Sequence, residues 1–128
     1  MEFKGEQPIY IQIADYIRRK ILKEKWSAEE RIPSIRDMAV RMEVNPNTVA
    51  RAYSLLQDEN IIFNKRGIGY FIQEGARSQV MERQKEEFFE DVLPELFKKM
   101  QLLGIKLGEI EDYYDEFEMS EGANEIIQ

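Results

Sequence analysis

Cysteine and histidine are both absent from this 128-residue chain. Without thiols there is no disulfide, no thiolate metal site and no cysteine nucleophile. Without imidazole the chain also lacks the commonest general base and metal ligand. We therefore expect no catalytic residue, no metal and no cofactor, and we predict that the protein is not an enzyme.

Long apolar runs are missing as well. No stretch approaches the ~20 residues that a membrane-spanning helix needs, and the first residues lack the basic-then-apolar pattern of a signal peptide. Hydrophobic residues make up 43% of the chain and charged residues 34%, which suits a folded, water-soluble protein. The length fits one domain with an appendage, and we expect a cytoplasmic location.

Basic residues are outnumbered, and the net charge is −7. The acidic excess is concentrated in the second part of the chain. Residues 1–75 contain 12 Lys and Arg against 11 Asp and Glu, whereas residues 76–128 contain 6 against 14. The first part can therefore still present a basic face to nucleic acid, because a polyanion responds to the local field.

The stretch 45–56 predicts a helix with two different faces. Asn45 suits the N-cap and Pro46 suits the first helical position. The apolar residues recur at helical spacing and predict the buried face: Val49, Ala52, Tyr53 and Leu56. The opposite face is polar: Asn47, Thr48, Arg51 and Ser54. Such side chains reach base edges and phosphates from a DNA groove, so the stretch is either a recognition helix or a capped amphipathic surface helix.

The segments before this helix complete a helix-turn-helix pattern. Residues 8–25 predict a first helix whose cationic end is either solvated or in contact with phosphate. Ser34 is a suitable N-cap for a short helix over residues 35–42. A short helix, a tight turn and a second helix with polar N-terminal residues are typical of a DNA-binding helix-turn-helix.

A small hairpin is predicted directly after the helix pair. Residues 61–64 and 70–73 are strand-like, and the turn between them carries Lys65, Arg66 and two glycines. This arrangement predicts a winged helix, in which the basic turn meets phosphates or enters the minor groove.

Residues 76–128 predict a helical tail. The spacing indicates helices over about 79–103 and 107–119, a kink or restart at Pro94, and fraying from Ser120. Two helices alone cannot form a hydrophobic core that buries so many large apolar side chains. They could pack against the first domain, but we favour self-association, which buries both stripes. The predicted dimerisation residues are Phe89, Leu93, Leu96, Met100, Leu103, Ile110, Tyr114 and Phe117.

Three motifs occur in order at the right spacing: residues 31–39 (RIPSIRDMA), 44–53 (VNPNTVARAY) and 67–71 (GIGYF). They resemble the N-terminal domain of the GntR family of bacterial transcription regulators over about residues 8–75. The sequence of the second motif is similar to that of the YtrA-like branch of the family, in which the short tail is a dimerisation element. It is also similar to the aminotransferase-fused branch, for whose enzyme domain this chain is too short.

The resemblance implies DNA contacts from the arginine after Pro-Ser, the start of the recognition helix and the wing. Many relatives have arginines where Pro46 and Ala50 stand, so the available cation here is Arg51. Phe71 replaces a common wing residue and is expected in the core. Together with the residue patterns, the resemblance gives these predicted DNA-binding residues: Ser34, Arg36, Asn45, Asn47, Thr48, Arg51, Lys65, Arg66, Gly67 and Gly69.

We therefore predict a mainly α (α+β) protein, with a winged-helix DNA-binding domain at 1–75 and a helical dimerisation tail at 76–128. Its predicted function is that of a dimeric repressor which binds a palindromic DNA operator. A small-molecule effector stays open. One rival is a winged-helix module that binds a protein and has no DNA affinity. The other is an enzyme or a fragment of the fused aminotransferase, for which the tail lysines Lys98, Lys99 and Lys106 lack a phosphate-binding loop.

Overall fold

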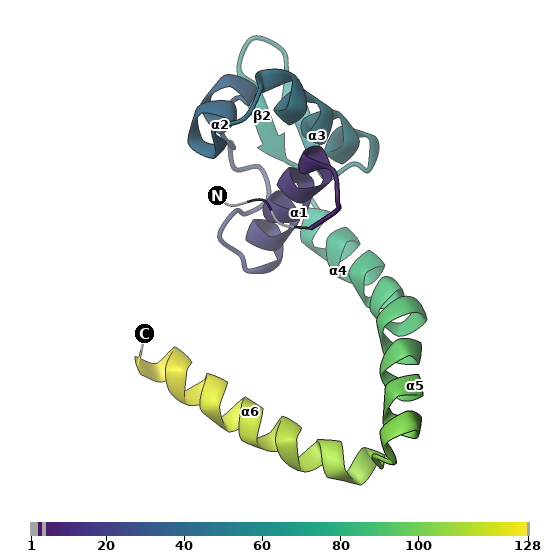
Figure 1. The fold of residues 1–128 in the computed structure, drawn as a ribbon. Coiled ribbons are helices and arrows are strands. Elements are labelled where there is room, and N and C mark those ends of the chain that lie inside the picture. The colour runs from purple at the N-terminus through teal and green to yellow at the C-terminus, as the bar shows by residue number, and fades with distance from the viewer. Residues whose placement is uncertain (1–2, 4, 128) are drawn as a thin grey trace. The chain divides into compact units, whose positions relative to one another are not determined.

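The computed structural model describes residue 3 and residues 5–127 (Figure 1). The chain divides into two compact units, Met1–Gln84 and Lys85–Gln128. None of the helices in this described part is long and apolar enough to cross a membrane. The elements follow in the order α1 (Ile9–Leu22), α2 (Ile35–Met42), α3 (Pro46–Asp58), β1 (Ile62–Lys65), β2 (Gly69–Ile72), α4 (Ala76–Glu87), the π-helical turn η1 (Phe88–Val92), α5 (Leu93–Leu103) and α6 (Leu107–Ile127).

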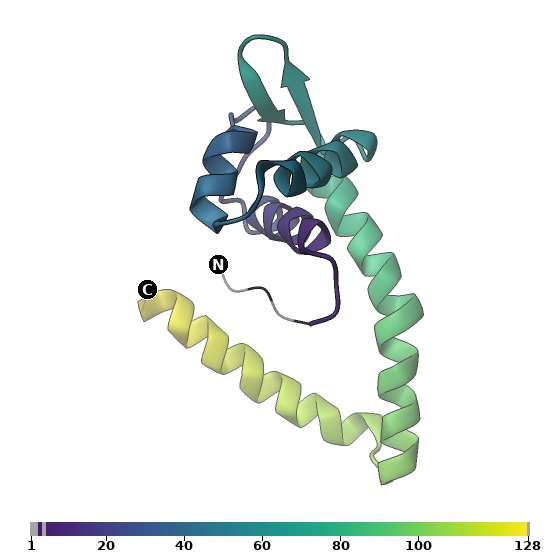
Figure 2. The same ribbon diagram turned by 45° about the horizontal axis from the view of Figure 1, so that its top comes forward.

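The core of the first unit lies between α1, α2 and α3 (Figure 2). Helix α3 packs on both α1 and α2, and the face predicted to be buried is buried. Each large aliphatic side chain removed from water in this way contributes roughly 1.5–3 kcal/mol before the entropy cost of ordering. The principal core residues of these helices are Ile13, Ile17, Ile21, Met38, Met42, Val49, Ala52, Tyr53 and Leu56.

Side-chain caps define where the two helices of the helix-turn-helix begin. The Ser34 hydroxyl accepts the Asp37 N–H at 3.1 Å, and the Asn45 Oδ1 accepts the Asn47 N–H at 2.8 Å. Pro46 occupies the first turn of α3, where its missing N–H costs nothing. Glu43 ends α2 in the left-handed conformation, with φ of 55°, so the chain reverses within three residues. The predicted helix-turn-helix is confirmed.

The predicted wing is an antiparallel hairpin. Strands β1 and β2 pair in a register that places Phe63 opposite Phe71 and Lys65 opposite Gly69. The loop between α1 and α2 runs along the other edge of β2. There the Glu29 N–H donates to the Ile72 carbonyl at 2.8 Å, and the Ile32 N–H donates to the Tyr70 carbonyl at 3.0 Å. The hairpin is therefore fastened to the segment that leads into α2.

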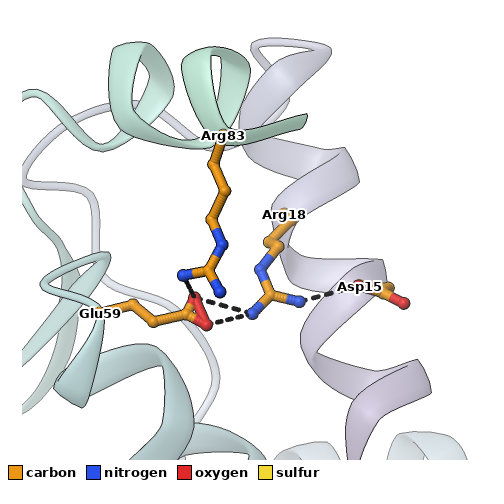
Figure 3. A network of polar contacts seen from close by, with 4 residues as sticks. All are labelled: Asp15, Arg18, Glu59 and Arg83. Atoms are coloured by element: carbon orange, nitrogen blue, oxygen red, sulfur yellow. Dashed lines mark hydrogen bonds and ion pairs between the residues drawn. The ribbon is translucent and has the colours of Figure 1, made fainter. Parts of the chain in front are cut away.

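An ion-pair network connects the C-terminal end of α3 to α1 and α4 (Figure 3). Arg18 donates to both oxygens of the Glu59 carboxylate and, at 2.8 Å, to Asp15. Arg83 of α4 lies 3.8 Å from the same Glu59 carboxylate. The Arg18 and Glu59 side chains are only 14% and 13% exposed, so this pairing is far less screened by solvent than a surface ion pair.

The first turns of α4 belong to the first unit, because Ala76 and Val80 are buried in its core. The helix begins at Ala76 rather than near residue 79, and the compact unit reaches Gln84. The predicted boundary at residue 75, between a DNA-binding domain and a dimerisation tail, stays a prediction.

The second unit begins in the last residues of α4 and contains η1, α5 and α6. The interruption expected at Pro94 takes the form of the π-helical turn that directly precedes α5. Gly104 ends α5 with φ of 68°, as a C′ glycine should. The expected fraying from Ser120 is wrong, because α6 continues to Ile127. No proline interrupts this stretch, and Gly122 alone is tolerated within a helix at a cost of about 1 kcal/mol.

Tyr53 joins the elements of the first unit at their centre. Its hydroxyl donates to the Pro33 carbonyl at 2.6 Å, and its ring meets the Tyr70 ring edge-on with centroids 4.9 Å apart. Burial raises the pKa of Tyr53 far above its ordinary value of 10.0, and the neighbouring Tyr70 raises it further. The phenol therefore remains a hydrogen-bond donor throughout the neutral range.

We predict that Tyr53→Phe lowers the free energy of unfolding by about 0.5–1.5 kcal/mol, because the partly buried Pro33 carbonyl loses its donor. Urea denaturation at pH 7 measures this loss. Tyr16→Phe is the matched control, since the Tyr16 hydroxyl has no hydrogen bond among the described residues, and it should be nearly neutral.

The same variant tests the pKa shift. The pKa of Tyr53 is higher in the folded than in the unfolded chain, so its stabilisation is complete below pH 10 and is lost as pH rises above 10. Tyr53→Phe should remove this part of the alkaline destabilisation. An identical alkaline loss in both proteins would contradict the assignment.

Candidate nucleic-acid interface

The polar face of α3 is open at its N-terminal end. Asn47, Arg51 and Ser54 are exposed and Thr48 is half-buried. Asn45 uses its Oδ1 to cap the helix, which leaves its amide N–H groups for another partner. Since the N-terminal end of a helix favours anions, this end of α3 suits a phosphate or the acceptor groups of base edges.

Helix α2 adds cationic charge beside this face. Arg36 is exposed in its first turn. Ser34, predicted to bind DNA, has its hydroxyl engaged with the Asp37 N–H, so its clearest role in the structure is to start α2 and thereby place Arg36.

The tip of the hairpin presents both predicted cations to solvent, since Lys65 and Arg66 are exposed. The Lys65 ammonium lies 5.1 Å from the centre of the Phe71 ring, which stacks on Phe63 at 5.7 Å. Phe71 was expected in the core, but it is half-buried on the hairpin surface. It therefore supports the lysine of the wing instead of filling the interior.

The two glycines of the wing have different reasons to be glycine. Gly67 has φ of 80° at the turn and nothing near it. Gly69 has φ of 147°, and a Cβ there would lie 2.9 Å from Nε of Arg31. Gly69 thus admits the Arg31 guanidinium against the hairpin. Its predicted DNA contact stays untested, whereas its internal packing role is visible.

Sequence reasoning missed Tyr10, Arg31 and Ile68 as members of this region. Tyr10 lies under the Arg51 guanidinium, Arg31 packs against Gly69, and Ile68 is 56% exposed at the turn of the hairpin. Arg31 and Ile68 stood inside the quoted motifs, and an apolar residue between two wing glycines was a usable signal. The pairing of Tyr10 with Arg51 had no local signal, because it joins two different helices.

The cationic end of α1 does not join this group. Tyr10 is near the start of α1 and contacts Arg51 in α3, whereas Arg18 contacts Glu59 at the far end of α3. The two helices therefore run in the same direction. The basic residues beyond Arg18 lie beside the C-terminal end of α3, away from Asn45, and this arrangement favours a solvated helix end.

Two arginines of the first unit outside the candidate interface are neutralised, although Arg19, Lys23 and Lys25 at the end of α1 have no ion pair among the described residues. Arg18 and Arg77 have carboxylate partners. In contrast, no ion pair within the described residues neutralises the cations of α2, α3 and the hairpin. In both ribbon views these three elements lie on one side of α1 (Figures 1 and 2). The unpaired cations of these elements are Arg36, Arg41, Arg51, Lys65 and Arg66, and Arg31 in the loop before α2 is unpaired as well.

The described residues hold no group of carboxylates that could bind a metal ion. The donors on this face are amides, hydroxyls, ammonium and guanidinium groups. Such a set can bind phosphates and base edges by hydrogen bonds and charge.

Comparison with known proteins gives a consistent result. The family model for bacterial regulatory proteins of the gntR family matches residues 9–72. The chain is 35% identical over 109 residues to the HTH-type transcriptional regulator YhcF of Bacillus subtilis, covering 85% of this chain and 88% of YhcF. It is 31% identical to the HTH-type transcriptional repressor YtrA of Bacillus subtilis, covering 88% of this chain and 86% of YtrA.

Among solved structures, a transcriptional regulator of the GntR family from Bacteroides thetaiotaomicron has the same fold. Its TM-score is 0.74 and its sequence identity 42%, with 89% of this chain and 99% of that chain covered. The similarity thus extends through the tail as well as the winged helix.

We predict that Lys65→Ala makes DNA binding less dependent on salt. Each lost phosphate contact should reduce the slope of log affinity against log salt by about 0.9 per protomer. Fluorescence anisotropy with a labelled duplex, titrated at several salt concentrations, measures this slope. Lys23→Ala at the end of α1 is the matched control and should leave the slope unchanged. Equal slopes for all three proteins would mean that the tip of the hairpin stays in solvent.

Proposed function

Because the chain belongs to the gntR family of bacterial regulatory proteins, we propose that it represses transcription as a homodimer bound to a palindromic operator. The observation that carries the proposal is the unpaired charge and polarity gathered on α2, the start of α3 and the hairpin. A winged-helix transcriptional regulator needs these three elements to meet DNA together. Catalysis has no part in the proposal.

In this proposal the three elements have different tasks. Asn47 and Thr48 at the start of α3 contact bases or phosphates in the major groove. Arg36 of α2 contributes a phosphate or guanine contact. Lys65 and Arg66 bring the hairpin to the backbone or the minor groove. The cations supply affinity, while the short polar side chains of α3 carry much of the sequence selectivity.

The second unit supports the dimer through its exposed apolar surface. Phe89 is 60% exposed, Leu103 62% and Phe117 61% in the single chain. Stable monomers rarely leave so many large apolar groups in contact with water. A second copy would cover these helices symmetrically. Met100, also predicted in this interface, is already buried within one chain, so it would support the interface from beneath.

A dimer also explains how a small winged helix could select its site. Two recognition helices related by a two-fold axis read half-sites about one helical turn apart. Bound across a promoter, such a dimer excludes polymerase. The YtrA relative is named a repressor, which agrees with this direction of control.

Selection of binding sites from a random DNA pool tests the proposed function. We predict an inverted repeat with half-site centres roughly 10 base pairs apart. Arg36→Ala should weaken binding to the selected duplex by about tenfold, the effect of losing a contact worth ~1–3 kcal/mol. Its circular dichroism spectrum should be unchanged, since Arg36 is exposed. If no sequence is enriched and no salt-dependent DNA binding is detected, the rival protein-binding module is favoured.

Mass measurement in solution tests the dimer separately. We predict twice the 15.2 kDa chain mass by analytical ultracentrifugation for the wild-type protein. Phe117→Lys should shift the protein towards monomer, because it would bury an unpaired charge in the interface. Met119→Lys is the control on the same helix, at a residue that is 77% exposed and outside the predicted interface. A monomeric wild-type chain would overturn the role given to the tail.

A further inference from the structure

Arg51 of α3 rests on an aromatic side chain from another helix. The centre of its guanidinium lies 4.0 Å from the centroid of the Tyr10 ring. Tyr10 is the second residue of α1 and is half-buried, whereas Arg51 is exposed. Among the described residues this is the shortest distance between a cation and an aromatic ring centre.

The contact orders Arg51 without neutralising it. A free arginine side chain loses up to ~2 kcal/mol of rotamer entropy when a partner fixes it. Stacking on a ring restricts the guanidinium in advance and leaves its N–H donors at the edge of the plane. Arg18, two turns after Tyr10 in α1, differs from Arg51 because its N–H groups donate to the carboxylates of Asp15 and Glu59. The Arg51 donors have no carboxylate partner among the described residues.

The location of the ring indicates which part of DNA Arg51 meets. Tyr10 lies beside α3 and holds the guanidinium towards α1. If the polar face of α3 lies in the major groove, a side chain held sideways towards α1 reaches the groove wall, which is formed by phosphates. Base edges on the groove floor are then left to Asn47 and Thr48.

We propose that Tyr10 is a positioning residue, which holds Arg51 for contact with a backbone phosphate at the edge of the major groove. Arg51 therefore contributes affinity for any duplex and little base selectivity. This inference rests on the DNA-binding function proposed above. It assigns a DNA-related role to a residue of α1 that has no place in the helix-turn-helix or the wing.

A double-mutant cycle tests the proposal on the full chain. Wild type, Tyr10→Leu, Arg51→Ala and the double variant are titrated against a labelled duplex of random sequence at low salt, where phosphate contacts dominate. Arg51→Ala should weaken binding about tenfold. Tyr10→Leu should weaken it about twofold to fivefold, as expected for an exposed cation–π contact. The double variant should bind no more weakly than Arg51→Ala alone.

Tyr10→Phe separates the ring from its hydroxyl. It retains the stacking surface, so its affinity should equal that of wild type. A loss as large as that of Tyr10→Leu would mean that the hydroxyl itself contacts DNA, and this result would overturn the positioning role. The positioning role would also be overturned if the loss of affinity in the double variant equalled the product of the two single losses, because Tyr10 would then act independently of Arg51.

Binding to a selected operator tests the phosphate assignment. Arg51→Ala should weaken binding to the operator and to its single base-pair variants by the same factor. Relaxed selectivity at one base pair would place Arg51 on a base and overturn that part of the proposal. Failure of the wild-type protein to bind any duplex would instead overturn the proposed function, a result distinct from equal binding by wild type and variants.

Discussion

The hydrogen bond from the Tyr53 hydroxyl to the Pro33 carbonyl is the contact on which the geometry of the candidate interface depends. Tyr53 belongs to α3, Pro33 precedes α2, and the Tyr70 ring that meets Tyr53 belongs to β2. One buried side chain therefore sets the positions of all three elements that carry exposed cations. Rotation of α3 about its axis would break this partly buried bond, and the loss of a hydrogen bond opposes that rotation. The orientation of its polar face follows from its buried face.

The described part of the first unit contains charged residues that are paired in a shielded position and others that are exposed and unpaired. Arg18 and Glu59 are mostly shielded from solvent and satisfy each other, which fixes the end of α3 that points away from the polar face. Arg36 and Arg66 remain exposed and unpaired within the described residues. A basic face is thus assembled on a unit whose sequence is almost neutral, and most of the acidic excess lies in the second part of the chain.

Much of this arrangement could be predicted from the sequence, because it is encoded locally. Helical spacing identified Val49 and Leu56 as buried, and the short polar residues Ser34 and Asn45 identified the helix starts. Features that depend on distant neighbours were not predictable. Nothing near Tyr10 indicates Arg51, and nothing near Gly69 indicates that the Arg31 side chain packs against it. Pro94 predicted an interruption but not its π-helical form, and the length of α6 was underestimated because no stop signal marks its end.

The hairpin also bears on aggregation. Only one edge of this two-stranded sheet is covered, because β2 bonds to the loop before α2 while β1 has no further strand partner in the described part of the chain. An open edge can pair with the hairpin of another molecule. This risk is greatest in the proposed complex, where two winged-helix units are bound to neighbouring half-sites. Here the edge is four residues long and ends at Lys65, followed by Arg66. Short edges and charged residues are the usual protection against edge-to-edge assembly. The cations proposed to attract DNA would therefore also prevent edge-to-edge pairing between the hairpins of two winged-helix units.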